Sequence, residues 1–203
     1  MRYLFCFLFL QLIFFCNASA QLAPVGQWRE HMDYREGKRV ALSDGHVFTA
    51  TNFGAYVVSR TDGEISRLSK VSGLNDVGVR TLNYNTATNK LLIAYNNSNL
   101  DVLYRNDVIN IPDIARSTAT GDKTIYDIFF AGNNAYLSSG LGVIVVDLQK
   151  YEISNTFIIG NNGSNVKVNG FAADATRFYA ATDEGLKVAN QSATNLNDYR
   201  SWT

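Results

Sequence analysis

Apolar and polar residues alternate over short stretches along most of the chain. In residues 90–104, KLLIAYNNSNLDVLY, two such stretches flank a cluster of Asn and Ser. Alternation with a period of two is typical of strands that bury one face, and Asn and Ser are typical of turns. The pattern predicts a β-hairpin here. No stretch predicts a convincing helix, and the Asn and Ser content of residues 190–199 favours a loop.

This hairpin recurs at a nearly constant spacing. Its turn is occupied in successive copies by Gly54, Asn99, Gly142 and Gly185, at steps of 45, 43 and 43 residues. Gly and Asn tolerate positive φ, which tight turns between twisted strands require. We therefore expect these four residues to be structural turn positions of one repeating unit.

The repeating unit contains four strand candidates. Before the central turn, two strands are separated by polar turns at residues 44–45, 85–89, 132–134 and 174–175. After it come a third strand and a fourth, the fourth at residues 63–69, 107–112, 151–159 and 198–202. Four-stranded antiparallel units every ~40–45 residues are typical of β-propeller blades. The predicted fold class is therefore all-β: a β-propeller with blades at residues 38–70, 78–112, 124–160 and 168–203, with a β-sandwich or β-solenoid as the alternative.

The first twenty residues have the pattern of a secretory signal peptide. Arg2 precedes an apolar run at residues 3–16, and Ala18 and Ala20 supply the small residues of a cleavage site, with Gln21 as the new N-terminus. The run is shorter than the ~20 apolar residues of a spanning helix, which argues against a membrane anchor. We expect an exported protein, in the periplasm or at the outer-membrane surface, with a folded domain at residues 21–203 and no stable membrane span.

Cysteine content and charge exclude several classes of function. Cys6 and Cys16 both lie in the predicted signal peptide, so the mature chain would have no disulfide, thiol nucleophile or thiolate metal site. The 18 basic residues balance the 18 acidic ones, and no stretch is strongly basic. The sequence therefore argues against binding to a nucleic-acid backbone.

A further strand candidate lies ahead of the first repeat, at residues 26–32. Propellers commonly close by pairing an N-terminal strand with the last blade, which removes exposed sheet edges. Trp28 is expected to be the buried anchor of such a strand. Four blades are the smallest known ring. The chain is therefore either a four-bladed ring closed by this segment or the first part of a longer propeller, and we favour the longer propeller.

No group of residues predicts catalysis or metal binding. His31 and His46 are the only histidines, and neither has carboxylates at ligand spacing, so we expect no metal site and no cofactor. Asp101 and Asp147 fall at matching places in their third strands and could form a glycosidase pair across the channel. The more ordinary role for both is to solvate strand faces or cap turns. Residues 138–142, SSGLG, are followed by no helix, which favours a hairpin turn over a phosphate loop.

Several segments, in this order, resemble the N-terminal propeller of the PorZ family. They are QWREHMDY, RLSKVSGLNDVGVRTLNYN, NIPDIARSTATGDKTIYDIFF, AYLSSGLGVIVVDLQKYEISNTFIIG and ATDEGLKVAN. That family is a surface component of the Bacteroidetes type IX secretion system. The resemblance implies a longer protein with two propellers and a C-terminal β-sandwich signal domain. It also implies a role in attaching anionic lipopolysaccharide to secreted cargo.

We expect a non-enzymatic binding or scaffold module that presents loops on a rigid framework. By resemblance, its partners would be secretion-system proteins or a surface glycan, namely lipopolysaccharide. The segment SGLNDVGVRTL is also similar to propeller repeats in front of hybrid two-component sensors. The first alternative is therefore a periplasmic sensor region that recognises oligosaccharide. The second is a fragment of a carbohydrate-active enzyme.

Overall fold

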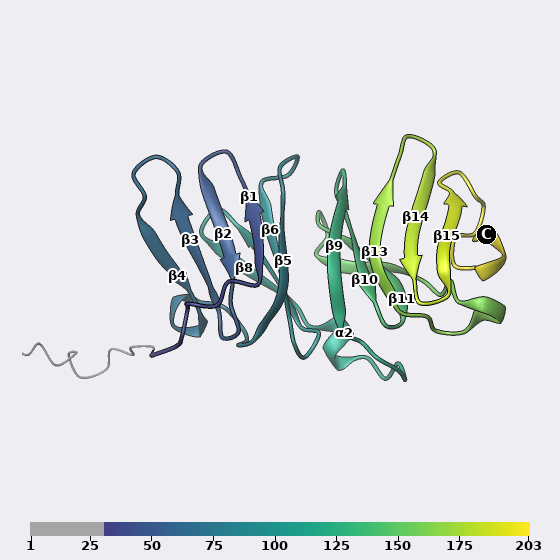
Figure 1. Cartoon of the computed structure of the whole chain (residues 1–203), viewed down its shortest axis with the longest axis horizontal. Coiled ribbons are helices and arrows are strands. Elements are labelled where there is room, and N and C mark those ends of the chain that lie inside the picture. Colours follow the sequence, from purple (N-terminus) through teal and green to yellow (C-terminus); the bar gives the residue numbers. More distant parts are fainter. Residues whose placement is uncertain (1–30) are drawn as a thin grey trace, which may run out of the picture. The chain divides into compact units, whose positions relative to one another are not determined.

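The computed structural model describes residues 31–203 (Figure 1). The predicted signal peptide, with Ala18, Ala20 and Gln21, lies outside the described residues. So does most of the predicted closing strand, including Trp28. Its last two residues, His31 and Met32, belong to no strand.

The strands form four antiparallel sheets, and strands that follow each other in the chain are neighbours in each sheet (Figure 1). The first sheet contains β1 (Arg39–Leu42), β2 (His46–Ala50), β3 (Ala55–Ser59) and β4 (Ile65–Leu68). The second contains β5 (Val79–Asn85), β6 (Lys90–Tyr95), β7 (Leu100–Tyr104) and β8 (Asp107–Ile111). The third contains β9 (Ile125–Ala131), β10 (Asn134–Ser139), β11 (Gly142–Asp147) and β12 (Glu152–Phe157). The fourth contains β13 (Val168–Ala173), β14 (Arg177–Thr182) and β15 (Gly185–Asn190).

These meanders confirm the predicted all-β propeller fold. The fourth sheet differs from the expectation, because it has three strands. Residues 198–202 were predicted to be its fourth strand, but Tyr199–Ser201 form a 3-10 helix, η3. Thr203 then exchanges two backbone hydrogen bonds with Val188, at 2.8 and 2.9 Å. Thr203 is therefore the residue that pairs with β15 in the place expected for a fourth strand.

The middle strands of the second and third sheets are the most buried because neighbouring sheets cover both of their faces. Every residue of β6 is buried, and its sequence KLLIAY has an almost continuous apolar run. The outer strand β12 instead mixes exposed and partly buried residues, and only Phe157 at its end is buried. A strand that is covered on both faces has no need of polar positions, whereas an outer strand keeps one side in water.

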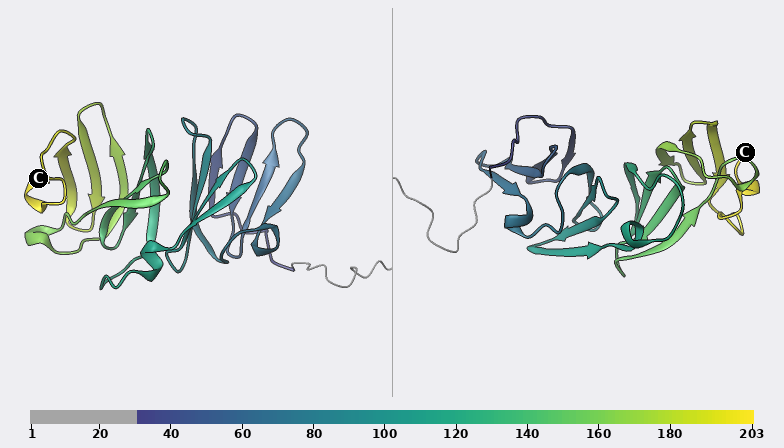
Figure 2. Two further views of the ribbon diagram at one scale, coloured as in Figure 1. Left: turned by 180° about the vertical axis from the view of Figure 1, so that it is seen from behind. Right: turned by 90° about the horizontal axis from the view of Figure 1, so that it is seen from below.

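The core lies in the layers between consecutive sheets. Contacts between sheets run mainly through the inner strands β1, β5, β9 and β13. Figure 2 shows the sheets following one another in chain order. Three apolar clusters fill the layers between the first and second, second and third, and third and fourth sheets. Each side chain the size of Leu, Ile or Phe that is buried there contributes about 1.5–3 kcal/mol.

The first sheet also has apolar side chains on the face turned away from the second sheet, which residues 32–35 cover only in part. Register places Leu42, Val47, Val58 and Ile65 side by side across its four strands. Leu42 and Ile65 keep 57% and 65% of their surface in solvent. In the fourth sheet, Leu186 is 62% exposed. Both end sheets therefore present apolar surface on the side away from their described neighbour.

Among the described residues, helical structure is limited to short connections. The sequence predicted no helix, but one turn, α2 (Asp113–Arg116), follows β8 and buries Ile114 in the core. The others are the 3-10 turns η1 (Lys70–Ser72), η2 (Asn161–Gly163) and η3. Within residues 31–203, no helix is long and apolar enough to cross a membrane.

Candidate functional site

The four predicted turn positions all lie where the second strand of a sheet turns into the third: Gly54 and Asn99 directly precede the third strand, and Gly142 and Gly185 begin it. They occupy these places for different reasons. Gly142 and Gly185 have positive φ, at 118° and 107°. The expectation of positive φ is wrong for Gly54 and Asn99, because in the second sheet Ser98 takes that conformation, with φ 65°. Gly54 is needed for space instead, since a Cβ there would lie 2.8 Å from the carbonyl oxygen of Leu68.

A hydroxyl closes three of these turns, a feature the sequence reading missed. Thr51, Ser139 and Thr182 donate to the carbonyl oxygen three residues ahead, at 3.0, 2.9 and 2.8 Å. Tyr95 holds the equivalent place in the second sheet. The segment around Ser139 is thus a hairpin turn, as its sequence predicted, and no helix follows it.

Asp101 lies in the interior of the second sheet. Its side chain has no exposed surface and accepts hydrogen bonds from Asn75 and Asn110 at 2.8–2.9 Å. The hydroxyl of Tyr95 donates to the same carboxylate at 2.5 Å. Burial, and then this hydrogen bond, raise the pKa of Tyr95 well above its usual range. Asp101 therefore holds loop and strand together, with all its acceptor positions directed at the chain itself.

Asp147 has another environment, so the two aspartates do not occupy matching places in their third strands, which argues against the glycosidase pair considered as an alternative. Asp101 is the second residue of β7, whereas Asp147 is the last residue of β11, at the other end of a third strand. Asp147 accepts from the backbone N–H groups of Lys150 and Gln149, at 3.1 and 2.7 Å, and these bonds lower its pKa. The structure does not bring the two carboxylates together as a glycosidase would require.

The histidines lie apart from each other. His46 begins β2 at the surface, with its ring centroid 6.1 Å from that of Phe48, and His31 lies ahead of β1. In the part of the chain that the structure describes, no three His, Asp or Glu side chains are placed to hold a metal ion.

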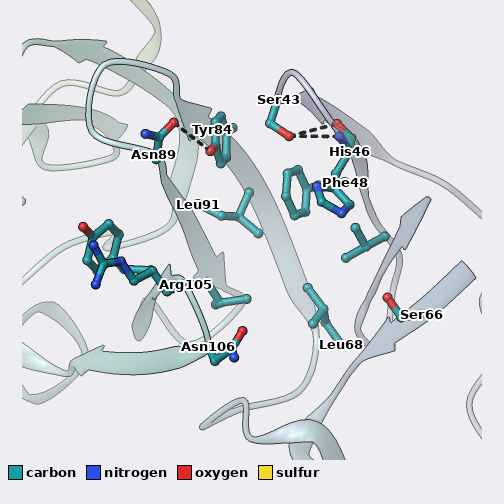
Figure 3. Close-up of a pocket in the computed structure, with 13 residues that line it drawn as sticks. Ser43, His46, Phe48, Ser66, Leu68, Tyr84, Asn89, Leu91, Arg105 and Asn106 are labelled. Atoms are coloured by element: carbon teal, nitrogen blue, oxygen red, sulfur yellow. Dashed lines mark hydrogen bonds between the residues drawn. The ribbon is translucent and has the colours of Figure 1, made fainter. Parts of the chain in front are cut away.

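A groove of about 580 Å³ lies between the first and second sheets (Figure 3). It opens at the end of the sheets where the β1–β2, β5–β6 and β7–β8 turns lie. We call it the intersheet groove. It is lined by Ser43, His46, Phe48, Val57, Ser66, Leu68, Tyr84, Asn89, Leu91, Leu103, Tyr104, Arg105 and Asn106.

Aromatic rings form the floor of the intersheet groove and polar groups surround it. Phe48 and Tyr84 stack with centroids 5.4 Å apart and planes 12° apart (Figure 3). The Tyr84 hydroxyl donates to Asn89 at 3.3 Å. Burial, and then the charge of Asp44, raise the pKa of Tyr84, so this hydroxyl stays protonated and can donate. Arg105 lies over the ring of Tyr104, 5.1 Å from its centroid.

This arrangement suits recognition better than catalysis. Ring surfaces with amide and guanidinium groups at the rim match the apolar and hydroxyl faces of a sugar or the side chains of a peptide. The sequence had no signal for the groove. Phe48 and Tyr84 come from different repeats, and only the packing of two sheets makes them neighbours.

Comparison with known proteins agrees with the fold. The model of the N-terminal β-propeller domain of PorZ, from the type IX secretion system, matches residues 35–203. No curated protein matches the chain in sequence. PorZ of Porphyromonas gingivalis, described as an essential bacterial surface component of that system, is 26% identical with a TM-score of 0.78. The match covers 88% of this chain and 23% of that one.

More distant structures share the fold alone. The extracellular domain of a putative hybrid two-component system from B. thetaiotaomicron is 14% identical, with a TM-score of 0.64, over 83% of this chain and 23% of that one. AztD from Citrobacter koseri is 13% identical, with a TM-score of 0.54, over 76% of this chain and 43% of that one. The family match, in contrast, extends over all four sheets. The chain belongs to the family of N-terminal β-propeller domains of PorZ, a component of the type IX secretion system.

Proposed function

We propose that this propeller is a non-enzymatic binding and scaffold module at the cell surface. There it would help attach anionic lipopolysaccharide to cargo of the type IX secretion system. The observation that carries the proposal is the family match over residues 35–203. The resemblance to an essential surface component supports the location. Because the chain spans 23% of the length of that protein, the lipopolysaccharide role belongs to the proposal.

The geometry supports binding as the task of this segment. Asp101, the most buried carboxylate considered for catalysis, is engaged by Asn75, Asn110 and Tyr95. At the rim of the intersheet groove, in contrast, the side chain of Arg105 is exposed to solvent, where a ligand can reach it. Propellers and other rigid scaffolds usually carry recognition in such loops and grooves. We propose that the intersheet groove contacts a secretion-system protein or the sugar chain of the glycan.

Deletion of the gene in its native host tests the secretion role. We expect cargo proteins to accumulate in the periplasm and to lack the mobility shift that attached lipopolysaccharide produces on a gel. Complementation with the whole protein should restore both properties. Normal secretion and normal lipopolysaccharide attachment in the deletion strain would refute the proposal.

A second experiment tests the intersheet groove. Complementation with a variant carrying Arg105→Ala and Asn106→Ala should give partial restoration, because both side chains lie at the rim and contribute little to the core. The matched control is Lys150→Ala with Glu152→Ala, an exposed pair on the third sheet. Equal restoration by the groove variant and the control would remove the groove from the proposal while leaving the secretion role in place.

A further inference from the structure

A second hollow, of about 340 Å³, lies at the other end of the inner strands. It is lined by Lys38, Arg39, Arg80, Tyr126 and Asn169, so every sheet contributes at least one residue. Arg39 is the first residue of β1, whereas Ser43 of the intersheet groove follows its last residue. The two hollows therefore open at opposite ends of the first sheet. We call the second one the axial pocket, because the inner strands of the four sheets line it.

A repeated β-bulge directs side chains into the axial pocket. In the second sheet, Val79 pairs with Tyr95 and Thr81 with Ala94, which leaves Arg80 without a partner in the ladder. A bulge of this kind inserts one residue, bends the strand and turns a side chain away from the regular alternation.

The same irregularity occurs at the start of the next two inner strands. The register shifts around Tyr126 in β9 and around Asn169 in β13, so each of these residues is also unpaired. From Arg80 the steps are 46 and 43 residues, close to the 43–45 residues of the repeat. The residue before each bulge, Val79, Ile125 or Val168, stays buried in the core. The bulge thus keeps the core intact and presents the following side chain at the axis.

Positive charge accumulates at this place in a chain that is neutral overall. Arg80 and Lys167 lie over the ring of Tyr126, at 5.4 and 4.5 Å from its centroid. Arg39 donates through Nη2 to the backbone oxygen of Tyr126 at 3.3 Å. Within residues 31–203, none of these three cations, nor Lys38, forms an ion pair.

Two carboxylates near the pocket are already engaged by neutral donors. Asp122 accepts from the hydroxyl of Tyr126, and Asp183 accepts from the side-chain amide of Asn169 at 2.8 Å. Each therefore positions a pocket residue. Alongside the hydrogen bonds that Asp122 accepts, the charge of Lys167 is among the causes that lower its pKa. The four positive groups still exceed these two negative ones, and like charges gathered in one pocket repel one another.

We infer that the axial pocket is a binding site for an anionic oxygen group, a phosphate or a carboxylate. The planar guanidinium groups of Arg39 and Arg80 offer paired N–H donors that match such a group, and Lys38 and Lys167 add charge. The second N–H of the Asn169 amide, beside the one that bonds to Asp183, adds a neutral donor. An anion there relieves the repulsion among the cations. The inference rests on these contacts and not on the secretion role.

Titration of the whole purified protein tests the inference. The probes are pyrophosphate for the phosphate source, galacturonate for the carboxylate source and galactose as the neutral comparison, each followed by isothermal titration calorimetry. We expect at least one anion to bind and galactose not to bind at this site. Affinity should fall as salt is raised from ~20 to ~150 mM, because screening weakens contacts between exposed charges.

Two variants locate the binding. Arg39→Gln with Arg80→Gln should weaken anion binding at least about tenfold, since each removes a charge-assisted contact. The control is Arg177→Gln, made both in the wild-type protein and in the double variant. It is exposed and begins β14 at the far end of the fourth sheet. Circular dichroism verifies that all variants fold.

Each outcome decides the inference. Binding of pyrophosphate but not galacturonate assigns a phosphate, and the reverse assigns a carboxylate. Failure of both anions to bind overturns the inference, as does equal weakening by Arg177→Gln and the double variant. Such a failure leaves the family and the secretion role untouched, because neither depends on the axial pocket. Conversely, anion binding by the purified protein would stand even if deletion of the gene left secretion normal.

Discussion

Asp101 accepts four hydrogen bonds while it is excluded from solvent. A buried carboxylate is costly unless donors surround it, and here a loop and two strands provide them. Asn75 lies between the first and second sheets, so Asp101 also fixes the connection between two repeats. At the scale of single residues, the buried carboxylate of Asp101 therefore stabilises the fold.

Asp101→Asn should lower the free energy of unfolding by about 2–4 kcal/mol, because one amide end would face donors that need an acceptor. Asp147→Asn is the matched control, and it should cost less than about 1 kcal/mol, since the amide oxygen still caps an exposed turn. The measurement is urea unfolding of both variants. Similar midpoints for the two would show that the buried network contributes little.

The environment of Asp174 predicts that acid destabilises the turn between β13 and β14. The Tyr179 hydroxyl, followed by the backbone N–H groups of Thr176 and Arg177, lowers the pKa of this exposed carboxyl well below 3.8. A lowered pKa means that the charged form stabilises the folded turn. That contribution is complete above about pH 3.8 and is lost as the pH falls toward the lowered value. We expect the β13–β14 turn to loosen in acid before the rest of the sheet.

Amide hydrogen exchange at Thr176 and Arg177, measured as the pH falls below 3.8, checks this expectation. Asp174→Asn should remove the pH dependence of the protection in this turn, after correction for intrinsic exchange rates. The prediction fails if the wild-type turn keeps its protection unchanged down to pH 2, or if the variant shows the same dependence.

At the scale of elements, equivalent turns in different sheets reach the same shape by different means. Gly142 needs both its left-handed φ of 118° and its lack of a side chain, because a Cβ would lie 2.2 Å from the carbonyl oxygen of Phe157. Gly185 has φ 107° but open space around it. The repeat therefore conserves the hairpin and not one chemical solution.

Alanine substitutions separate conformational strain from steric overlap. Gly185→Ala should cost about 1–2 kcal/mol of unfolding free energy, the typical penalty for a left-handed L-residue. Gly142→Ala should cost clearly more, because the strand β12 must also move. Thermal or urea unfolding gives both values. Equal losses at the two positions would mean that the third sheet yields to the added methyl group without cost.

At the scale of the whole molecule, the exposed faces of the end sheets are the main unexplained surface. Leu42 and Ile65 lie on one such face and Leu186 on another. Apolar patches of this kind usually mark an interface. We propose that further blades of a longer propeller cover them, which agrees with the expectation that residues 21–203 form part of a larger domain.

The chain produced without further blades is expected to self-associate and to lack a cooperative thermal transition as a monomer. Leu42→Thr with Ile65→Thr should reduce the association seen by sedimentation, and Val71→Thr, at an exposed apolar residue in η1, should not. In a longer protein that includes the neighbouring blades, the double substitution should instead destabilise the fold. A soluble, cooperatively melting monomer of the wild-type chain would contradict this view.

The amino-acid sequence determined the sheets of this protein. Alternation with a period of two, together with turn residues every 43–45 positions, identified the strands and the blade repeat, because both signals are local in the chain. The main errors lay at chain ends and irregularities: the missing fourth strand near Thr203, the helix after Pro112 and the conformation of Gly54.

Only the tertiary structure decided what the side chains do. The intersheet groove needs Phe48 beside Tyr84, and the axial pocket needs Arg39 beside Arg80 and Tyr126. These residues come from different repeats, and their types vary from copy to copy, so spacing alone does not mark them. Register shifts in the inner strands and packing between sheets bring them together. Such contacts depend on which surfaces meet, and alternation along a strand contains no information about that.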